Sequence, residues 1–273
     1  DGLRQILWGF FKKVVIADNC AVYANDIFNN SGDHSGSTLF FGALFFTFQI
    51  YGDFSGYSDI ALGSARLLGF ELLKNFNFPY FSRDIAEFWR RWNISLSSWF
   101  RDYIYIPLGG SKGGNWMRIR NTFIIFLVSG FWHGANWTFI VWGGLNALFM
   151  VPSMLMRTNR QNIEIVAQGR ILPSIKEVFQ LAFTFSLTVF AWIFFRAASV
   201  SHALLYIKGL FSTSLFSKPN LPNQGWLILG LVLFFMIIEW FGRESDFAIQ
   251  KIFSNQRRAI RWGFYALILF LIG

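Results

Sequence analysis

Charged residues are scarce in this 273-residue chain: they make up 14% of it, while 54% of the residues are hydrophobic. A soluble globular domain carries about 25% charged residues, and a disordered chain combines low hydrophobicity with high charge. The composition therefore excludes a disordered chain and argues against a soluble enzyme. It favours a protein that is surrounded by lipid.

Residues that build metal and redox sites are equally scarce. Cys20 is the single cysteine of the sequence, which excludes an internal disulfide, a thiolate metal cage and a CxxC redox pair. Histidine occurs at three positions, His34, His133 and His202, which leaves little for a histidine metal site. We therefore expect no metal and no bound cofactor.

Aromatic residues, by contrast, make up 20% of the chain, and tryptophan and tyrosine are typical of membrane interfaces. The net charge of +9 would suggest nucleic acid on a soluble protein, but no basic stripe or nucleic-acid-binding motif accompanies it. Basic residues of membrane proteins gather in cytoplasmic loops. The expected partner is therefore the lipid bilayer, and no nucleic-acid partner is expected.

Long apolar runs predict where the chain crosses the membrane, because a spanning helix needs about 20 such residues. Four runs qualify: 39–68, 136–156, 175–196 and 226–241. The run 119–131 is too short to cross alone, and the charge-bearing segment 3–24 is expected to form a tilted, interfacial or protein-buried helix. The predicted fold is all-α, a multi-pass transmembrane helical bundle with re-entrant and amphipathic interfacial helices.

Loop charges give the orientation. The loops 157–176 and 243–261 are rich in Lys and Arg and are predicted to be cytoplasmic, whereas 197–225 is poor in them and is predicted to be external. Segment 119–156 is flanked by basic residues at both ends, so it should enter the membrane and return, or dip deeply before a tilted exit. His133, about 20 Å of helix from residue 119, would then lie at bilayer depth near the turn.

Segment 83–103 shows the pattern of one amphipathic helix. Its apolar residues share one helical face and its charged residues the other, as is typical of a helix at a membrane surface or under a bundle. Asn93 lies at the edge of the apolar face. Its amide could bond an imidazole or a substrate oxygen, or it could simply be a surface amide.

His133 is the main candidate for chemistry, since an ionisable residue at membrane depth is costly to bury and histidine exchanges protons near neutral pH. Gly130 and Gly134 flank it and would let another helix or a substrate come close. The alternative is a structural histidine bonded to a backbone carbonyl. Asp53 and Asp59 lie in an apolar run, where they either pair with Arg66 or basic loop residues or line a polar path.

Two motifs resemble a known family. One runs from Arg83 to Gly110 and centres on Phe88-Trp89-Arg90-Arg91-Trp92-Asn93-Ile94-Ser95, and the other is Trp132-His133-Gly134. With the stretches 51–59 and 191–196, they resemble the membrane-bound O-acyltransferase (MBOAT) family, in its bacterial alginate O-acetyltransferase-like branch. The resemblance covers nearly the whole chain. It implies a single MBOAT-like membrane domain over 1–273, truncated at both ends, from the C-terminal part of a longer protein.

The resemblance also implies a chemistry. His133 falls on the family's invariant histidine, here a general base, and Asn93 falls on a second family position where many relatives carry histidine. An acyl group, expected to be acetyl from acetyl-CoA, would pass from a thioester donor toward hydroxyls of an envelope polysaccharide, either directly or through a periplasmic acetyl-relay protein. The location implied is the bacterial inner membrane.

Further candidate substrate-binding residues are Trp132, Asn136, Arg91 and Asp53. Two other classes of function stay open at this point. One is a polytopic transporter or channel, and the other is a non-catalytic subunit of a polysaccharide export complex.

Overall fold

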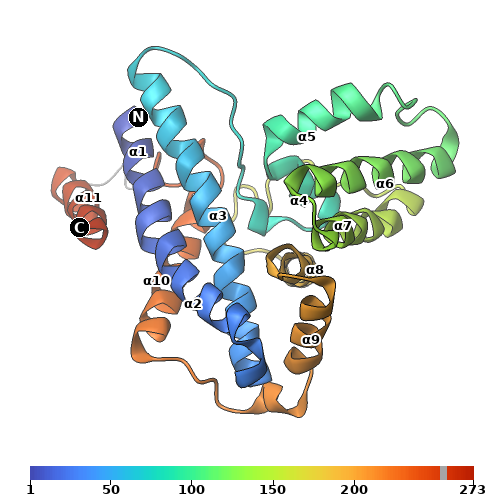
Figure 1. The fold of residues 1–273 in the computed structure, drawn as a ribbon. Helices are drawn as coiled ribbons and strands as arrows, with labels where there is room; N and C mark the ends of the chain where they lie inside the picture. Colours follow the sequence, from blue (N-terminus) through green and yellow to red (C-terminus); the bar gives the residue numbers. More distant parts are fainter. Residues whose placement is uncertain (253–256) are drawn as a thin grey trace. The chain divides into compact units, whose positions relative to one another are not determined.

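Helices form all the regular secondary structure in residues 1–252 and 257–273, the part of the chain that the computed structural model describes. They divide into two units: residues 1–77 with 212–273, and residues 78–211 (Figure 1). The predicted all-α fold is therefore confirmed.

In the first unit, the N-terminal helices α1 to α2 pack against the long helix α3, and the C-terminal helices α10 and α11 pack against η1. The elements of this unit are α1 (Gly2–Phe10), the π-helix η1 (Phe11–Ala17), α2 (Asp18–Asn29), η2 (Ser31–Asp33), α3 (Gly36–Leu67), η5 (Thr213–Phe216), α10 (Asn223–Gly242) and α11 (Arg258–Ile272). Segment 3–24 is thus one continuous helical path through α1, η1 and α2. One face of it, with Trp8, Phe11 and Lys12, is buried within this unit, whereas Leu3 and Val22 are exposed.

Glycines bring α1 and α3 into backbone contact. A Cβ on Gly9 would lie 2.7 Å from the carbonyl oxygen of Gly56, and a Cβ on Gly56 would lie 2.8 Å from that of Gly9. Small residues let helices approach in this way in membrane proteins.

Asp53 and Asp59 of α3 pair with the lysines of η1. Lys13 lies 2.6 Å from Asp53 and the buried Lys12 lies 2.6 Å from Asp59. Of the two interpretations of these aspartates, structural pairing is therefore the one the structure shows. Their partners come from the neighbouring helix, whereas Arg66 bonds to Gln5 and Asp246.

The second unit carries the two resemblance motifs. Its elements are η3 (Pro79–Phe81), α4 (Ile85–Arg91), α5 (Ile94–Phe100), the π-helix η4 (Arg101–Tyr105), α6 (Gly114–His133), α7 (Trp137–Leu155), α8 (Ile175–Arg196) and α9 (Val200–Leu210). The prediction of one helix over 83–103 is wrong, because the chain leaves the helical path at Trp92 and Asn93. Asn93 adopts the left-handed conformation (φ 44°, ψ 59°), which asparagine tolerates better than most residues.

Part of the charged face of this segment is buried, whereas Arg101 and Asp102 at its end are exposed. Glu87 is 1% exposed and receives the guanidinium groups of Arg83 and Arg91 at 3.0 and 2.8 Å. Burial of these paired charges holds α4 inside the unit. In α4 the charged side of the amphipathic pattern therefore meets protein, at Glu87 and Arg91, rather than water alone.

Helices α6 and α7 form a tight antiparallel hairpin. Gly130 packs against the backbone of Phe139, and Gly143 packs against the backbone of Phe126. His133 is the last residue of α6, which places it at the turn, as the sequence predicts. The apolar run 119–131 lies inside this 20-residue helix.

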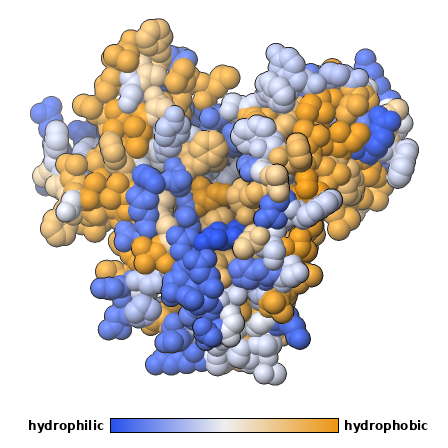
Figure 2. Space-filling view, in the orientation of Figure 1, coloured by the Kyte–Doolittle hydropathy of each residue, from blue (hydrophilic) through white to orange (hydrophobic). Residues whose placement is uncertain are grey.

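Three helices of the described residues are long and apolar enough to cross a membrane: α7, α8 and α10. They coincide with three of the four predicted runs, whereas the fourth run forms α3, which carries Asp53 and Asp59. Exposed apolar side chains are frequent on these helices, such as Phe183 on α8 and Leu233 on α10. Figure 2 shows that hydrophobic residues cover much of the visible surface, as expected where lipid replaces water.

Candidate active site

Aromatic rings from three helices contact His133, which is half-buried. The ring of Trp132 precedes it at 5.0 Å, Trp142 and Phe139 of α7 lie at 5.3 and 6.1 Å, and Phe195 of α8 lies at 5.0 Å, measured between ring centroids. Trp142 and Phe195 present their planes nearly perpendicular to the imidazole.

The turn after His133 is fixed by Gly134 and Asn136. Gly134 ends α6 with φ 151°, a conformation that favours glycine. The Asn136 side chain then accepts a hydrogen bond from the Thr138 backbone N–H at 3.1 Å and starts α7. Its amide nitrogen donates to the Ala198 carbonyl at 2.9 Å, which ties the turn to the segment after α8. His133 is therefore held where three helices meet.

The imidazole itself makes ring contacts and no hydrogen bond or ion pair to any of the residues 1–252 and 257–273. The bond to a backbone carbonyl, which a purely structural histidine would make, is not formed there. Neither nitrogen is occupied by a protein partner within this part of the chain. A neutral imidazole in this state can accept a proton from a bound hydroxyl.

Asn93 is buried, with 9% of its surface exposed, and its side chain does not cap α5. A chain of indole rings connects its neighbourhood to the histidine. Trp92 packs against Trp192 at 5.2 Å, Trp192 stacks on Trp142 at 5.7 Å, and Trp142 contacts His133. Trp92, the residue before Asn93, thus belongs to the same aromatic cluster as His133.

The other candidate residues lie in different surroundings. Trp132 is beside the imidazole and is 61% exposed, and Asn136 forms the turn. Arg91 is buried in the ion pair with Glu87, and Asp53, in the first unit, pairs with Lys13. The structure therefore places Trp132 and Asn136 next to His133, while Arg91 and Asp53 already have partners of opposite charge.

Sequence reasoning missed the walls of the site: Trp142, Trp192 and Phe195. The sequence did contain one indication of which face of α7 lines the site: Asn146 is an amide in an otherwise apolar run. The structure buries it and lets it accept a hydrogen bond from the Trp89 indole at 3.2 Å, which ties α4 to α7. Polar residues inside a predicted span usually face the protein interior, so Asn146 marks the inner face of α7 and, one turn away, Trp142.

The described residues hold no group of three or more His, Cys, Asp or Glu side chains that could bind a metal ion. What they bring together is a histidine with unoccupied nitrogens, at the end of a helical hairpin and within an aromatic cluster. These features define a helical membrane protein with a candidate proton-accepting site.

Comparison with known proteins assigns the family. The chain belongs to the MBOAT, or membrane-bound O-acyltransferase, family, whose sequence pattern matches residues 2–196. It is 40% identical over 245 residues to a probable alginate O-acetylase, AlgI, of Pseudomonas aeruginosa. The aligned region covers 89% of this chain and 45% of that protein. It is 38% identical over 209 residues to the peptidoglycan O-acetyltransferase of Helicobacter pylori, which covers 77% of this chain and 38% of that protein.

A shorter match concerns the teichoic acid D-alanyltransferase of Streptococcus thermophilus. The two chains are 40% identical over 111 residues, which cover 38% of this chain and 27% of that protein. The chain spans less than half the length of these relatives. The family match includes α1 to α8 and so contains both Asn93 and His133.

Proposed function

We propose that this chain carries the reaction centre of a membrane O-acyltransferase that moves an acyl group, acetyl in the first instance, from a thioester donor toward hydroxyls of an envelope polysaccharide. The observation that carries the proposal is His133, whose nitrogens have no protein partner in the described residues and whose ring is walled by aromatic side chains. Membership of the family supports the reaction class. The names of the relatives, which act on alginate and peptidoglycan, support a polysaccharide acceptor.

In the proposed reaction, a nitrogen of neutral His133 accepts the proton of the acceptor hydroxyl while its oxygen attacks the thioester carbonyl. The tetrahedral intermediate collapses with cleavage of the C–S bond. The thiolate leaves and takes the proton back from the imidazolium, so that an ester and a thiol are formed and the histidine is neutral again. No net proton is consumed, which suits a base that has no acidic partner in its described surroundings.

Asn93 is proposed to orient His133 or to donate a hydrogen bond to the oxygen that becomes negative in the intermediate. Preorganised donors of this kind are worth about 10²–10³ in rate. Asn93 is buried, and its amide is not used to cap α5. Trp132 and Asn136 are proposed to contact the acceptor beside the imidazole, while Arg91 and Asp53 remain candidates for substrate contacts.

The donor is proposed to be acetyl-CoA and the chain to be a multi-pass protein of the bacterial inner membrane. A histidine between a cytoplasmic donor and an external acceptor could serve both. The acetyl group then reaches the polysaccharide directly or through a periplasmic relay protein. The names of the relatives, an alginate O-acetylase and a peptidoglycan O-acetyltransferase, support the polysaccharide end of this scheme.

The decisive experiment is His133→Ala in the full-length protein, with His34→Ala of the first unit as the matched control. Envelope O-acetyl groups and the amount of protein in the membrane are measured together. We expect the loss of a general base to lower transfer by about 10²–10⁴-fold, with normal membrane levels and an active His34→Ala control.

Unchanged O-acetylation in His133→Ala at normal membrane levels contradicts the proposal. The two alternatives have signatures of their own. A transporter or channel moves substrate in reconstituted vesicles without any acyl donor. A non-catalytic export subunit tolerates His133→Ala but loses export when its surface residues are changed.

A further inference from the structure

Two exposed tryptophans flank the turn at His133. Trp132 directly precedes the histidine and is 61% exposed, and Trp137, the first residue of α7, is 75% exposed. Neither indole N–H makes a hydrogen bond to residues 1–252 or 257–273, and the ring of Trp137 contacts no other ring in that part of the chain. An indole offers apolar faces and one N–H donor. Both rings are therefore able to pack against a ligand and to bond it.

The backbone that carries Trp137 is held close to the imidazole. Asn136, directly before it, donates a hydrogen bond from its amide to the Ala198 carbonyl at 2.9 Å. Phe139, two residues after it, contacts the His133 ring at 6.1 Å between centroids. The main chain on both sides of Trp137 is thus fixed near the proton-accepting site, while its indole is exposed.

A tryptophan at the end of a membrane helix can also be a simple interface anchor. Trp226, near the start of α10, is such a residue: it is 43% exposed and packs against Phe41 at 5.4 Å. Helices α7 and α10 each end next to a basic loop that is predicted to be cytoplasmic, so both of their starts are predicted to be external. Trp137 shares this position but has no ring partner in the described residues and lies beside a histidine. This contrast favours a ligand at Trp137 and makes Trp226 a suitable control.

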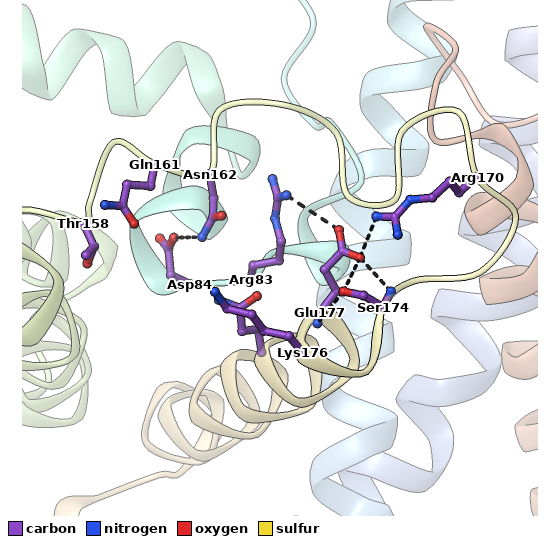
Figure 3. Close-up of a pocket in the computed structure, with 10 residues that line it drawn as sticks. Arg83, Asp84, Thr158, Gln161, Asn162, Arg170, Ser174, Lys176 and Glu177 are labelled. Carbon is purple, nitrogen blue, oxygen red and sulfur yellow. Dashed lines mark hydrogen bonds and ion pairs between the residues drawn. The ribbon is translucent and has the colours of Figure 1, made fainter.

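The charges of the second unit suit a neutral or acidic ligand at this turn. Asp84 and Glu177 line a polar cavity of about 500 Å³ at the start of α8 (Figure 3). The contact between Phe195 and His133 lies at the other end of this helix, about 27 Å from Glu177. No Asp or Glu occurs in residues 103–163 or 178–211, which include the whole α6–α7 hairpin. No carboxylate of these segments therefore repels an acidic sugar.

An acceptor hydroxyl imposes two demands on the site. It must lie within hydrogen-bond reach of an imidazole nitrogen, and the group that carries it must be oriented for attack on the thioester. A sugar ring has C–H groups on its faces, which pack on an aromatic ring, and hydroxyls at its edges, which accept an indole N–H. Exposed indoles before and after the histidine meet both demands.

From these features we propose that Trp137, together with Trp132, forms the platform on which a sugar ring of the acceptor packs while its hydroxyl meets His133. Trp137 then determines acceptor binding and takes no part in proton transfer. The inference rests on the proposed acyl transfer to a polysaccharide and specifies how that acceptor is held. It requires a sugar at this turn rather than a protein acceptor.

The kinetic test uses the full-length protein in detergent, acetyl-CoA and two acceptor probes. These are alginate oligosaccharides and peptidoglycan glycan strands, both freed of acetyl groups. The acceptor KM and kcat are measured for the unchanged protein, Trp137→Ala and Trp137→Phe. We expect Trp137→Ala to raise the KM for at least one probe tenfold or more, with a much smaller change in kcat. Trp137→Phe keeps an aromatic ring and should retain most of the affinity.

Trp226→Ala is the matched control, an exposed tryptophan near the start of another candidate span. We expect its acceptor KM to equal that of the unchanged protein. The unfolding midpoint of each variant is measured alongside. If Trp137→Ala and Trp226→Ala both lower the midpoint and both leave the KM unchanged, the two tryptophans are interface anchors and the platform is wrong.

Direct binding separates this inference from the acyl-transfer reaction. Isothermal titration calorimetry measures binding of both probes to the unchanged protein, to His133→Ala and to Trp137→Ala. We expect His133→Ala to lose transfer and keep binding, and Trp137→Ala to bind at least tenfold more weakly. Transfer that persists in His133→Ala contradicts the proposed reaction alone. Equal binding to the unchanged protein and Trp137→Ala, or no binding of either probe, contradicts the platform.

Discussion

Gly143 of α7 lies directly against the carbonyl oxygen of Phe126 in α6, with no room for a Cβ between the two backbones. This contact and its counterpart at Gly130 set the spacing of the hairpin that carries His133. A methyl group at Gly143 must push the helices apart, since backbone cannot move aside as a flexible side chain can. The position of His133 therefore depends on a residue that never touches it.

Gly143→Ala should separate α6 from α7 and displace His133 from Trp142 and Phe195. Overpacking of this kind costs about 1–3 kcal/mol, and small misplacements of a catalytic group cost about 100-fold in rate. The neighbouring Gly144→Ala is the control, because its Cβ would meet only Leu127, at 3.9 Å. O-acetyl transfer and the unfolding midpoint of both variants are measured, and equal behaviour of the two would contradict this account of the hairpin.

Asn93 allows backbone and amide effects to be separated. Asn93→Gly keeps the left-handed conformation and removes only the amide, whereas Asn93→Ala adds a left-handed strain of about 1–2 kcal/mol. We expect both to lose transfer activity by about 10²–10³-fold and only the alanine variant to melt earlier. Full activity in Asn93→Gly removes the amide from the mechanism. Asn93→His then distinguishes an orienting role, which histidine can fill, from one that needs an amide.

The sequence predicts α7, α8 and α10 because each is a long apolar run, and it singles out His133 because a lone titratable group in such surroundings is costly. It does not predict the break at Asn93, since the apolar residues on both sides keep helical spacing. It also cannot distinguish a charged face that meets water from one that meets protein, as the burial of Glu87 and Arg91 shows. Nor does it predict that Trp142 and Phe195 contact His133, because these contacts form only when α7 and α8 pack together.

The buried Glu87 pairs with the buried Arg91 and the half-buried Arg83, so its charge should matter for folding. Glu87→Gln keeps the shape but leaves Arg83 and Arg91 without their carboxylate, and breaking a buried pair costs about 3–5 kcal/mol. We expect a much lower unfolding midpoint and less protein in the membrane. Asp102→Asn is the control, because Asp102 meets Arg101 in an exposed ion pair at 2.7 Å and should be nearly neutral. A midpoint for Glu87→Gln equal to that of the control would show that this buried charge is dispensable.

Lys74 links the segment after α3 to the connection between α10 and α11. Its ammonium donates to the Asn77 side chain at 2.9 Å and to the Ser245 carbonyl at 3.4 Å. Burial disfavours the charged form and lowers the pKa of Lys74 to about 8 from its usual 10.5. Between these two values the unfolded chain holds the proton that the folded chain releases, so stability should rise as the pH increases from 8 to 10.5.

Unfolding midpoints of the unchanged protein and of Lys74→Met are measured in detergent at pH values from about 7.5 to 10.5. This range spans the pKa of Lys74 in the folded chain, about 8, and its usual pKa of 10.5. Tyrosine and other groups also titrate in this range, but they do so in both proteins, so the difference between the two curves isolates Lys74. We expect the unchanged protein to gain stability relative to Lys74→Met as the pH rises through this window. Parallel curves would mean that Lys74 keeps its ordinary pKa and is hydrated in the folded protein.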